Sequence, residues 1–87
     1  MTIYSFKQMY KEKNPDGHWF DKDTLKFFGE KLSEMKVLNG TYKVTDWMGN
    51  ECEAYCVRHK QRPPYGEPFW KETYFDVNTM ENILMDN

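Results

Sequence analysis

The stretch WFDKDTLKFFGEKLSEM, residues 19–35, contains the longest helical pattern in the chain. Asp21 is a good N-cap residue, because its carboxylate can accept a bond from a free backbone N–H of the first helical turn. Four apolar residues then recur at the helical period and predict one apolar stripe: Leu25, Phe28, Leu32 and Met35. We therefore predict a main helix over about residues 21–37.

Two residues in this stretch do not fit a simple amphipathic helix. Gly29 would lie in the helix interior, where glycine costs roughly 1 kcal/mol against alanine. We expect the close approach of a strand or another helix to compensate for it. Phe27 lies outside the apolar stripe, so it either widens the side that faces the core or belongs to a second contact surface.

The composition predicts one small folded domain, residues 1–87. Aromatic residues make up 17% of the chain, too many for a disordered protein despite 30% charged residues. The net charge of −2 excludes a globally basic nucleic-acid binder, although a local basic patch stays open. The sequence has no run of ~18 apolar residues, which a membrane span would need, and no apolar leader. We expect a cytoplasmic protein with reduced cysteines.

The N-terminal segment predicts a short helix over Ser5–Lys13. Ser5 and Gln8 have the spacing of a capping box, which makes Ser5 the expected N-cap. The run Asn14-Pro15-Asp16-Gly17 is a strong turn signal and ends this helix.

Three strands are predicted after the main helix, over residues 41–48, 51–60 and 69–75. Gly49-Asn50 favours a tight hairpin turn between the first two. The three prolines of residues 62–68 remove backbone donors and predict a loop before the third strand. The small side chains of the second strand, which we expect to face the helix, are Cys52, Ala54 and Cys56.

The start signal of the main helix returns near the C-terminus. Tyr74 to Met80 repeats the pattern of Trp19 to Leu25: aromatic, Phe, Asp, any residue, Asp or Asn, Thr, apolar. Asp76 then corresponds to Asp21 as a helix cap, and a C-terminal helix is expected over Val77 to about Met85. The predicted fold is α+β, a three-stranded antiparallel sheet packed by the main helix, with short N- and C-terminal helices.

Metal and catalytic sites are not predicted. Cys52, Cys56 and His59, with His18, could supply four zinc ligands. On a strand, however, positions 52 and 56 lie about 13 Å apart at ~3.3 Å per residue, too far to share an ion. No phosphate loop, nucleophile elbow or dinucleotide motif is present. We therefore expect neither metal, cofactor nor enzymatic activity.

The densest charge in the chain lies at the end of the second strand and in the following loop. Basic groups beside aromatic rings can contact phosphates and stack on bases, but they can equally bind a protein or only solvate a strand end. The candidate binding residues are Arg58, His59, Lys60, Arg62, Tyr65 and Trp70.

Residues 17–30, GHWFDKDTLKFFGE, resemble a family of small uncharacterised proteins encoded by phages and prophages. The basic, proline-containing residues 57–66 and the segment 74–80 are similar to two weaker motifs of that family. The family often has a glycine where this chain has Lys36. The resemblance implies a phage or mobile-element origin, and it implies no activity.

Small size, many aromatic residues and the phage resemblance favour a binding protein that acts by stoichiometric contact. We expect a bacterial protein as its partner, for example a host or defence machine inhibited in the manner of an anti-CRISPR protein. The alternative is a nucleic-acid-binding accessory protein that uses the basic and aromatic residues of 58–70.

Overall fold

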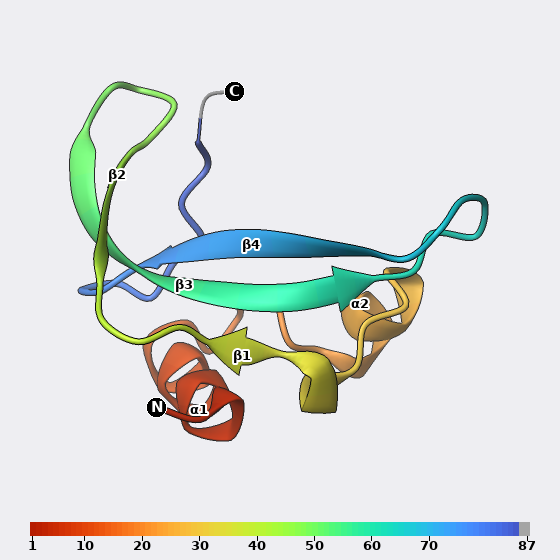
Figure 1. Ribbon diagram of the computed structural model, residues 1–87. Helices are drawn as coiled ribbons and strands as arrows, with labels where there is room; N and C mark the ends of the chain where they lie inside the picture. The colour runs from red at the N-terminus through yellow and green to blue at the C-terminus, as the bar shows by residue number, and fades with distance from the viewer. Residues whose placement is uncertain (86–87) are drawn as a thin grey trace.

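The computed structural model describes residues 1–85, and it has an α+β fold in which helices lie on one side of a twisted antiparallel sheet (Figure 1). The elements, in chain order, are helix α1 (Ile3–Lys13), helix α2 (Lys22–Phe27), a 3₁₀ turn (Leu32–Glu34), and strands β1 (Lys36–Val37), β2 (Tyr42–Thr45), β3 (Glu51–Gln61) and β4 (Phe69–Asp76). The predicted fold class is confirmed.

The long strand β3 lies at the centre of the sheet and pairs with every other strand. β4 follows one side of β3, from Ala54↔Asp76 to Gln61↔Phe69. β1 and β2 share the other side, where β1 pairs near Val57 and β2 pairs with residues 51–54. The sheet is therefore three strands wide, and β1 and β2 together form one interrupted edge.

The three predicted strands are present, with slightly different bounds. The predicted β2–β3 hairpin is present, but β2 ends at Thr45 instead of residue 48 and the turn begins at Asp46, whose carbonyl accepts the N–H of Gly49 at φ +85°. The prediction that the cysteine side of β3 faces the helices is wrong. Tyr55 and Val57 face them instead, while Ala54 and Cys56 are buried among neighbouring strands on the other face.

The predicted N-terminal helix is confirmed, but it starts earlier than expected. Thr2, not Ser5, is its N-cap: the Thr2 hydroxyl accepts the Ser5 N–H at 3.1 Å. Starting at Ile3 allows Ile3, Phe6 and Tyr10 to lie on one buried side of the helix. The predicted N-cap, Ser5, is therefore wrong, and the true N-cap lies three residues earlier.

The predicted main helix over residues 21–37 is wrong beyond its first turns. α2 ends at Phe27, Gly29 takes φ +64°, and the chain turns back toward the sheet. A Cβ on Gly29 would lie 2.7 Å from the Arg62 Cβ, so Gly29 does allow a close approach, but in a turn rather than inside a helix. Lys36 and Val37 then pair with Arg58 and Val57 of β3 as strand β1, where the sheet supplies partners for backbone groups that a helix end leaves unpaired.

Asp21 is the N-cap residue of α2, but its side chain makes no capping bond. Its carboxylate accepts from Lys11 Nζ at 3.0 Å and lies 2.7 Å from His18 Nδ1. These two contacts, that of His18 first, lower the pKa of Asp21. Asp21 thus ties α1 to the start of α2 instead of closing a helix end.

The predicted C-terminal helix over residues 77–85 is also wrong. Asp76 does act as a cap, since its Oδ1 accepts the N–H groups of Asn78 and Thr79, but only one turn follows. Met80 adopts φ +60° and ends that turn. The chain then runs back along the outer edge of β4, where Asn82 bridges Phe75.

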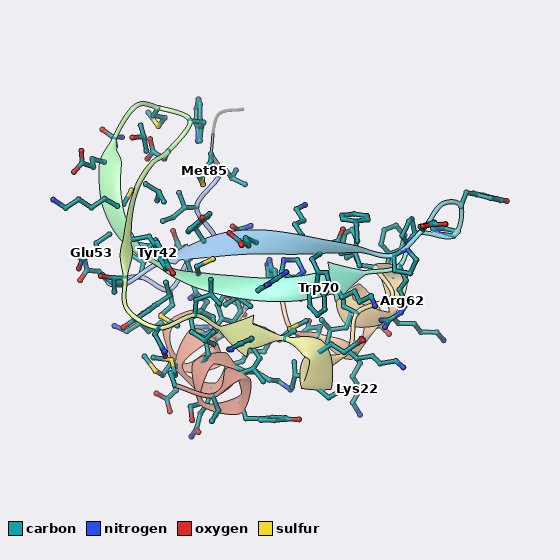
Figure 2. All side chains as sticks on the ribbon, viewed as in Figure 1. Lys22, Tyr42, Glu53, Arg62, Trp70 and Met85 are labelled. Atoms are coloured by element: carbon teal, nitrogen blue, oxygen red, sulfur yellow. The ribbon has the colours of Figure 1, made fainter. Side chains whose placement is uncertain are left out.

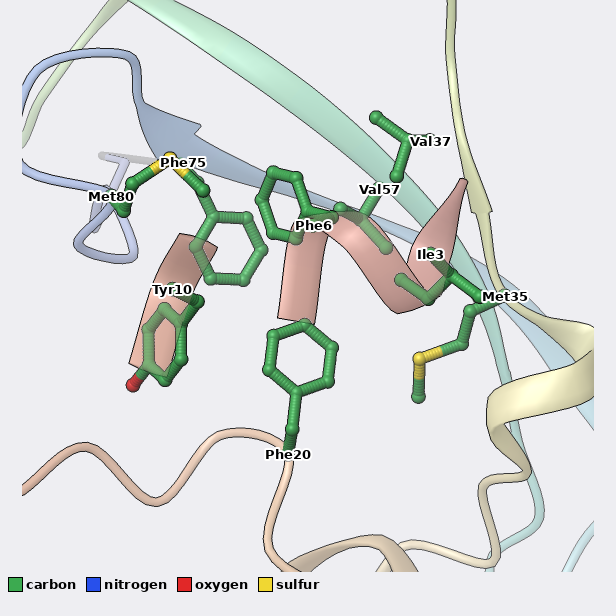
Figure 3. Packing of buried hydrophobic residues seen from close by; sticks show 9 residues of the cluster. All are labelled: Ile3, Phe6, Tyr10, Phe20, Met35, Val37, Val57, Phe75 and Met80. Atoms are coloured by element: carbon green, nitrogen blue, oxygen red, sulfur yellow. The ribbon is translucent and has the colours of Figure 1, made fainter. Parts of the chain in front are cut away.

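The core lies between α1 and the helix-facing side of the sheet (Figure 3). Phe6 is at its centre and meets the rings of Phe20, Tyr55 and Phe75 edge-on, with centroids 5.0–6.1 Å apart. The buried cluster consists of Ile3, Phe6, Tyr10, Phe20, Met35, Val37, Val57, Phe75 and Met80. Aromatic rings therefore contribute much of this small core.

Within residues 1–85, none of the helices has the length and apolar character that crossing a bilayer requires.

Candidate functional site

Three of the predicted binding residues meet on the sheet face that the helices leave uncovered. Arg58 and Lys60 are alternate residues of β3, and Trp70 lies on β4, directly opposite Lys60. The Arg58 guanidinium carbon lies 5.1 Å from the centre of the Trp70 ring, and the Lys60 ammonium lies 5.7 Å from it. Trp70 is 50% exposed, so this cation–π cluster is open to solvent.

A shallow hollow of about 540 Å³ lies beside this cluster. It is bounded by Trp70 and Arg58 on one side and by Ser33, Glu34, Met35 and Lys36 on the other. Lys36 is paired with Arg58 across β1 and β3, so it adds a third positive charge. We call Lys36, Arg58, Lys60 and Trp70, together with this hollow, the basic–aromatic face.

The cations of the basic–aromatic face are free to meet a partner. Within the described part of the chain, none of Lys36, Arg58 and Lys60 forms an ion pair. Arg58 and Lys60 thus lie over a large half-exposed ring, a combination that is typical of binding surfaces, with Glu72 of β4 paired opposite Arg58.

Arg62 has a different position from the other predicted binding residues. Its guanidinium forms two bonds to the Glu34 carboxylate, at 2.7 and 2.5 Å, and a third to the Gly29 carbonyl at 3.0 Å. The bond from Arg62 lowers the pKa of Glu34 and raises that of Arg62. Arg62 thus joins the end of β3 to the segment after α2, at the same end of the sheet as Trp70 (Figure 2).

Tyr65 lies apart from the basic–aromatic face. It is 93% exposed in the β3–β4 loop, which projects beyond the sheet (Figure 1). Phe27, whose position the sequence left open, is 78% exposed and packs edge-on against Phe28, at 5.0 Å between centroids. Of the two alternatives for Phe27, a second contact surface fits this position better than the core does.

His59 is buried on the opposite side of β3, so it does not join the exposed cations. Its Nδ1 hydrogen-bonds the Glu30 carboxylate, and its Nε2 lies 2.7 Å from the Thr73 hydroxyl. Trp19 meets its ring edge-on at 5.1 Å. Only 1% of the His59 side chain and 4% of the Glu30 side chain are exposed.

Sequence reasoning did not find Lys36, Glu30 or Thr73. Glu30 and Lys36 fell within the predicted main helix, outside its apolar stripe, and Thr73 within the third predicted strand. The alternation of polar Arg58 and Lys60 with His59 on β3 was the available signal, because period 2 places His59 on the core side.

Cys52 and Cys56 lie on one strand, as the sequence predicted. In residues 1–85, no group of three or more His, Cys, Asp or Glu side chains could hold a metal ion. Burial and the nearby Glu72 carboxylate raise the pKa of the Cys56 thiol, which keeps it protonated and weakly reactive.

A model of a family of unknown function (DUF7447) matches residues 2–82 of the chain. No curated protein and no solved structure gives a significant match.

Proposed function

The chain belongs to this family of unknown function, and we propose that it is a small phage-type protein that binds a bacterial protein stoichiometrically through its basic–aromatic face. The proposed partner is a host or defence machine in the bacterial cytoplasm, whose activity is modulated or blocked in the manner of an anti-CRISPR protein. The phage origin rests on the resemblance of residues 17–30.

One observation carries this proposal: a half-exposed tryptophan has two cations, Arg58 and Lys60, over its ring and a third, Lys36, lining the same hollow, and within residues 1–85 none of the three forms an ion pair. Tryptophan and arginine are the residues that most often dominate the energy of a protein interface. The adjoining hollow has room for a side chain of the partner. The matching partner surface would be acidic, with an apolar or aromatic residue that enters the hollow.

The test is capture of a partner from bacterial lysate with two matched tryptophan variants. Trp70→Ala removes the ring at the centre of the face. Trp47→Ala removes a ring that is 63% exposed in the β2–β3 turn, away from the face. We expect wild type and Trp47→Ala to capture the same host protein, and Trp70→Ala to bind it about 30-fold more weakly, since a hot-spot truncation costs about 2 kcal/mol or more.

Two results would reject the proposal: a folded wild-type protein that captures no specific partner, or a Trp70→Ala protein that binds as well as wild type. A thermal unfolding curve of each variant controls for loss of structure.

The same cations also support a second candidate, a nucleic-acid-binding accessory protein. Trp70 could stack on a base while Arg58, Lys60 and Lys36 contact phosphates. The net charge of −2 opposes binding to a polyanion over a wide surface, which places this candidate second. Gel shifts with single-stranded DNA and RNA at low and moderate salt decide it, because binding through phosphates falls steeply with salt. Arg58→Ala with Lys60→Ala is the appropriate variant, since Arg62 is bonded to Glu34.

A further inference from the structure

The helix-facing side of the sheet carries a second site, which the binding face does not use. Glu30, His59 and Thr73 form a continuous hydrogen-bonded chain, carboxylate to imidazole to hydroxyl. Glu30 comes from the segment after α2, His59 from β3 and Thr73 from β4. We propose that this triad makes Thr73 a nucleophile that accepts an acyl group from a small activated ester.

With Glu30 ionised and His59 neutral, these hydrogen bonds place the protons where such chemistry needs them. An ionised Glu30 carboxylate can only accept, so the proton of a neutral His59 ring lies on Nδ1. Nε2 is then an acceptor, and the Thr73 hydroxyl donates to it across 2.7 Å. This is the arrangement in which a histidine can take the proton of an attacking hydroxyl.

Neighbouring side chains hold Glu30 and His59, the two buried members of the triad, in place. The Gln61 amide donates to the second oxygen of Glu30 at 3.4 Å, and the Trp19 ring packs against His59. Burial keeps water away from the Glu30–His59 bond, and a hydrogen bond in such surroundings is stronger than one exposed to solvent.

A small cavity gives the Thr73 hydroxyl access to a ligand. It has a volume of about 230 Å³, and both His59 and Thr73 line it. Lys71 also lines it and brings a positive charge, which suits an ester whose carbonyl oxygen becomes negative during attack. Trp19 and Phe28 supply apolar wall for the acyl group. The volume restricts the ligand to a short acyl chain.

The proposed reaction has two steps. Thr73 Oγ attacks the ester carbonyl carbon and its proton passes to His59 Nε2. The bond from that carbon to the alkoxy oxygen then breaks, and the departing alcohol takes the proton. In the second step water attacks the acyl carbon and gives a proton to His59 Nε2. The bond from that carbon to Thr73 Oγ then breaks, Oγ takes the proton from His59, and the carboxylic acid leaves.

The test uses p-nitrophenyl acetate as the probe and the full chain as the enzyme. We expect release of p-nitrophenolate and one acetyl group on the peptide that contains Thr73. Hydroxylamine should remove this group, because it cleaves the ester of an acetylated threonine but not the amide of an acetylated lysine. Thr73→Ser should keep the acetylation, whereas Thr73→Val, which preserves shape, should abolish it. Thr45→Val, an exposed change on β2, is the control.

Glu30→Gln tests the positioning role of Glu30. The glutamine amide can donate to His59 Nδ1, which leaves the ring proton on Nε2. Nε2 then cannot accept the proton of the Thr73 hydroxyl. We expect acetylation of Thr73 to slow by about tenfold or more, with the urea unfolding midpoint retained.

Two results would contradict the proposal: acetyl groups found only on lysines, or equal labelling of wild type and Thr73→Val. Either result would show that the triad has only a structural role. Trp70→Ala should not change the labelling, which separates this result from the proposed binding function.

Discussion

Gly29 is the residue on which the path of residues 28–35 depends. Its positive φ lets the chain leave α2, and its missing side chain lets Arg62 come within contact distance. The Phe28 carbonyl then accepts the Arg62 N–H at 2.9 Å. Any side chain at position 29 would therefore have to displace backbone as well as adopt a left-handed conformation.

We expect Gly29→Ala to lower the free energy of unfolding by about 2–4 kcal/mol, the sum of left-handed backbone strain and overpacking. Gly49→Ala is the matched control, since Gly49 has a positive φ but nothing within 4 Å of its added Cβ. It should lose only about 1 kcal/mol. Urea denaturation measures both, and equal losses would contradict the close approach.

The Glu34–Arg62 pair gives the protein a predictable response to acid. The pKa of Glu34 is lower in the folded protein, because Arg62 bonds the carboxylate. The stability that the pair contributes is therefore fully present above the unfolded-state pKa of a glutamate, and it is lost as the pH falls through the lower folded-state value.

Glu34→Gln should remove this part of the acid dependence. Unfolding midpoints in urea, measured from neutral to acidic pH, should fall more for wild type than for Glu34→Gln. Glu12→Gln, an exposed change on α1 with no ion pair in residues 1–85, should follow wild type. Parallel curves for wild type and Glu34→Gln would show that the pair does not stabilise the fold.

At the level of elements, local patterns predicted α1 and strands β2, β3 and β4 but missed β1 and failed for the other two helices. The β2–β3 turn depends on Gly49 and Asp46, which are neighbours in sequence, so it could be predicted. α2 also ends in a local signal, Gly29 at positive φ with the Gly29 and Glu30 N–H groups donating to the Lys26 and Leu25 carbonyls, and the prediction missed it. Only the contact of this turn with Arg62, far along the chain, lies outside any local pattern. Leu32 and Met35 have helical spacing, yet pairing of the following residues with β3 outweighs it.

The same distinction applies to the candidate site. Arg58, Lys60 and Trp70 could be predicted because they lie on two strands that a short loop joins. Lys36 could not, because it reaches the basic–aromatic face through β1, a strand of two residues with no sequence signal of its own. Glu30 reaches His59 by the same unpredicted turn at Gly29.

For the molecule as a whole, stability depends on a few rings packed between α1 and the sheet. Phe6→Ala should cost about 3–5 kcal/mol, because Phe6 is fully buried at the centre of the core. Phe27→Ala is its control, the same change at a residue that is 78% exposed, and it should stay within about 0.5 kcal/mol of wild type. Chemical denaturation followed by circular dichroism compares them. A comparable loss in both would place Phe27 in a packed environment.

The interrupted edge formed by β1 and β2 also affects how the protein behaves at high concentration. A long flat edge strand offers unpaired backbone groups to other chains and promotes aggregation. Here that edge is broken into strands of two and four residues, with Gly40 at φ +79° between them. On the other side, the segment around Asn82 covers one end of β4. On the β1–β2 side the molecule thus exposes a broad sheet face while giving other copies little continuous edge on which to extend the sheet.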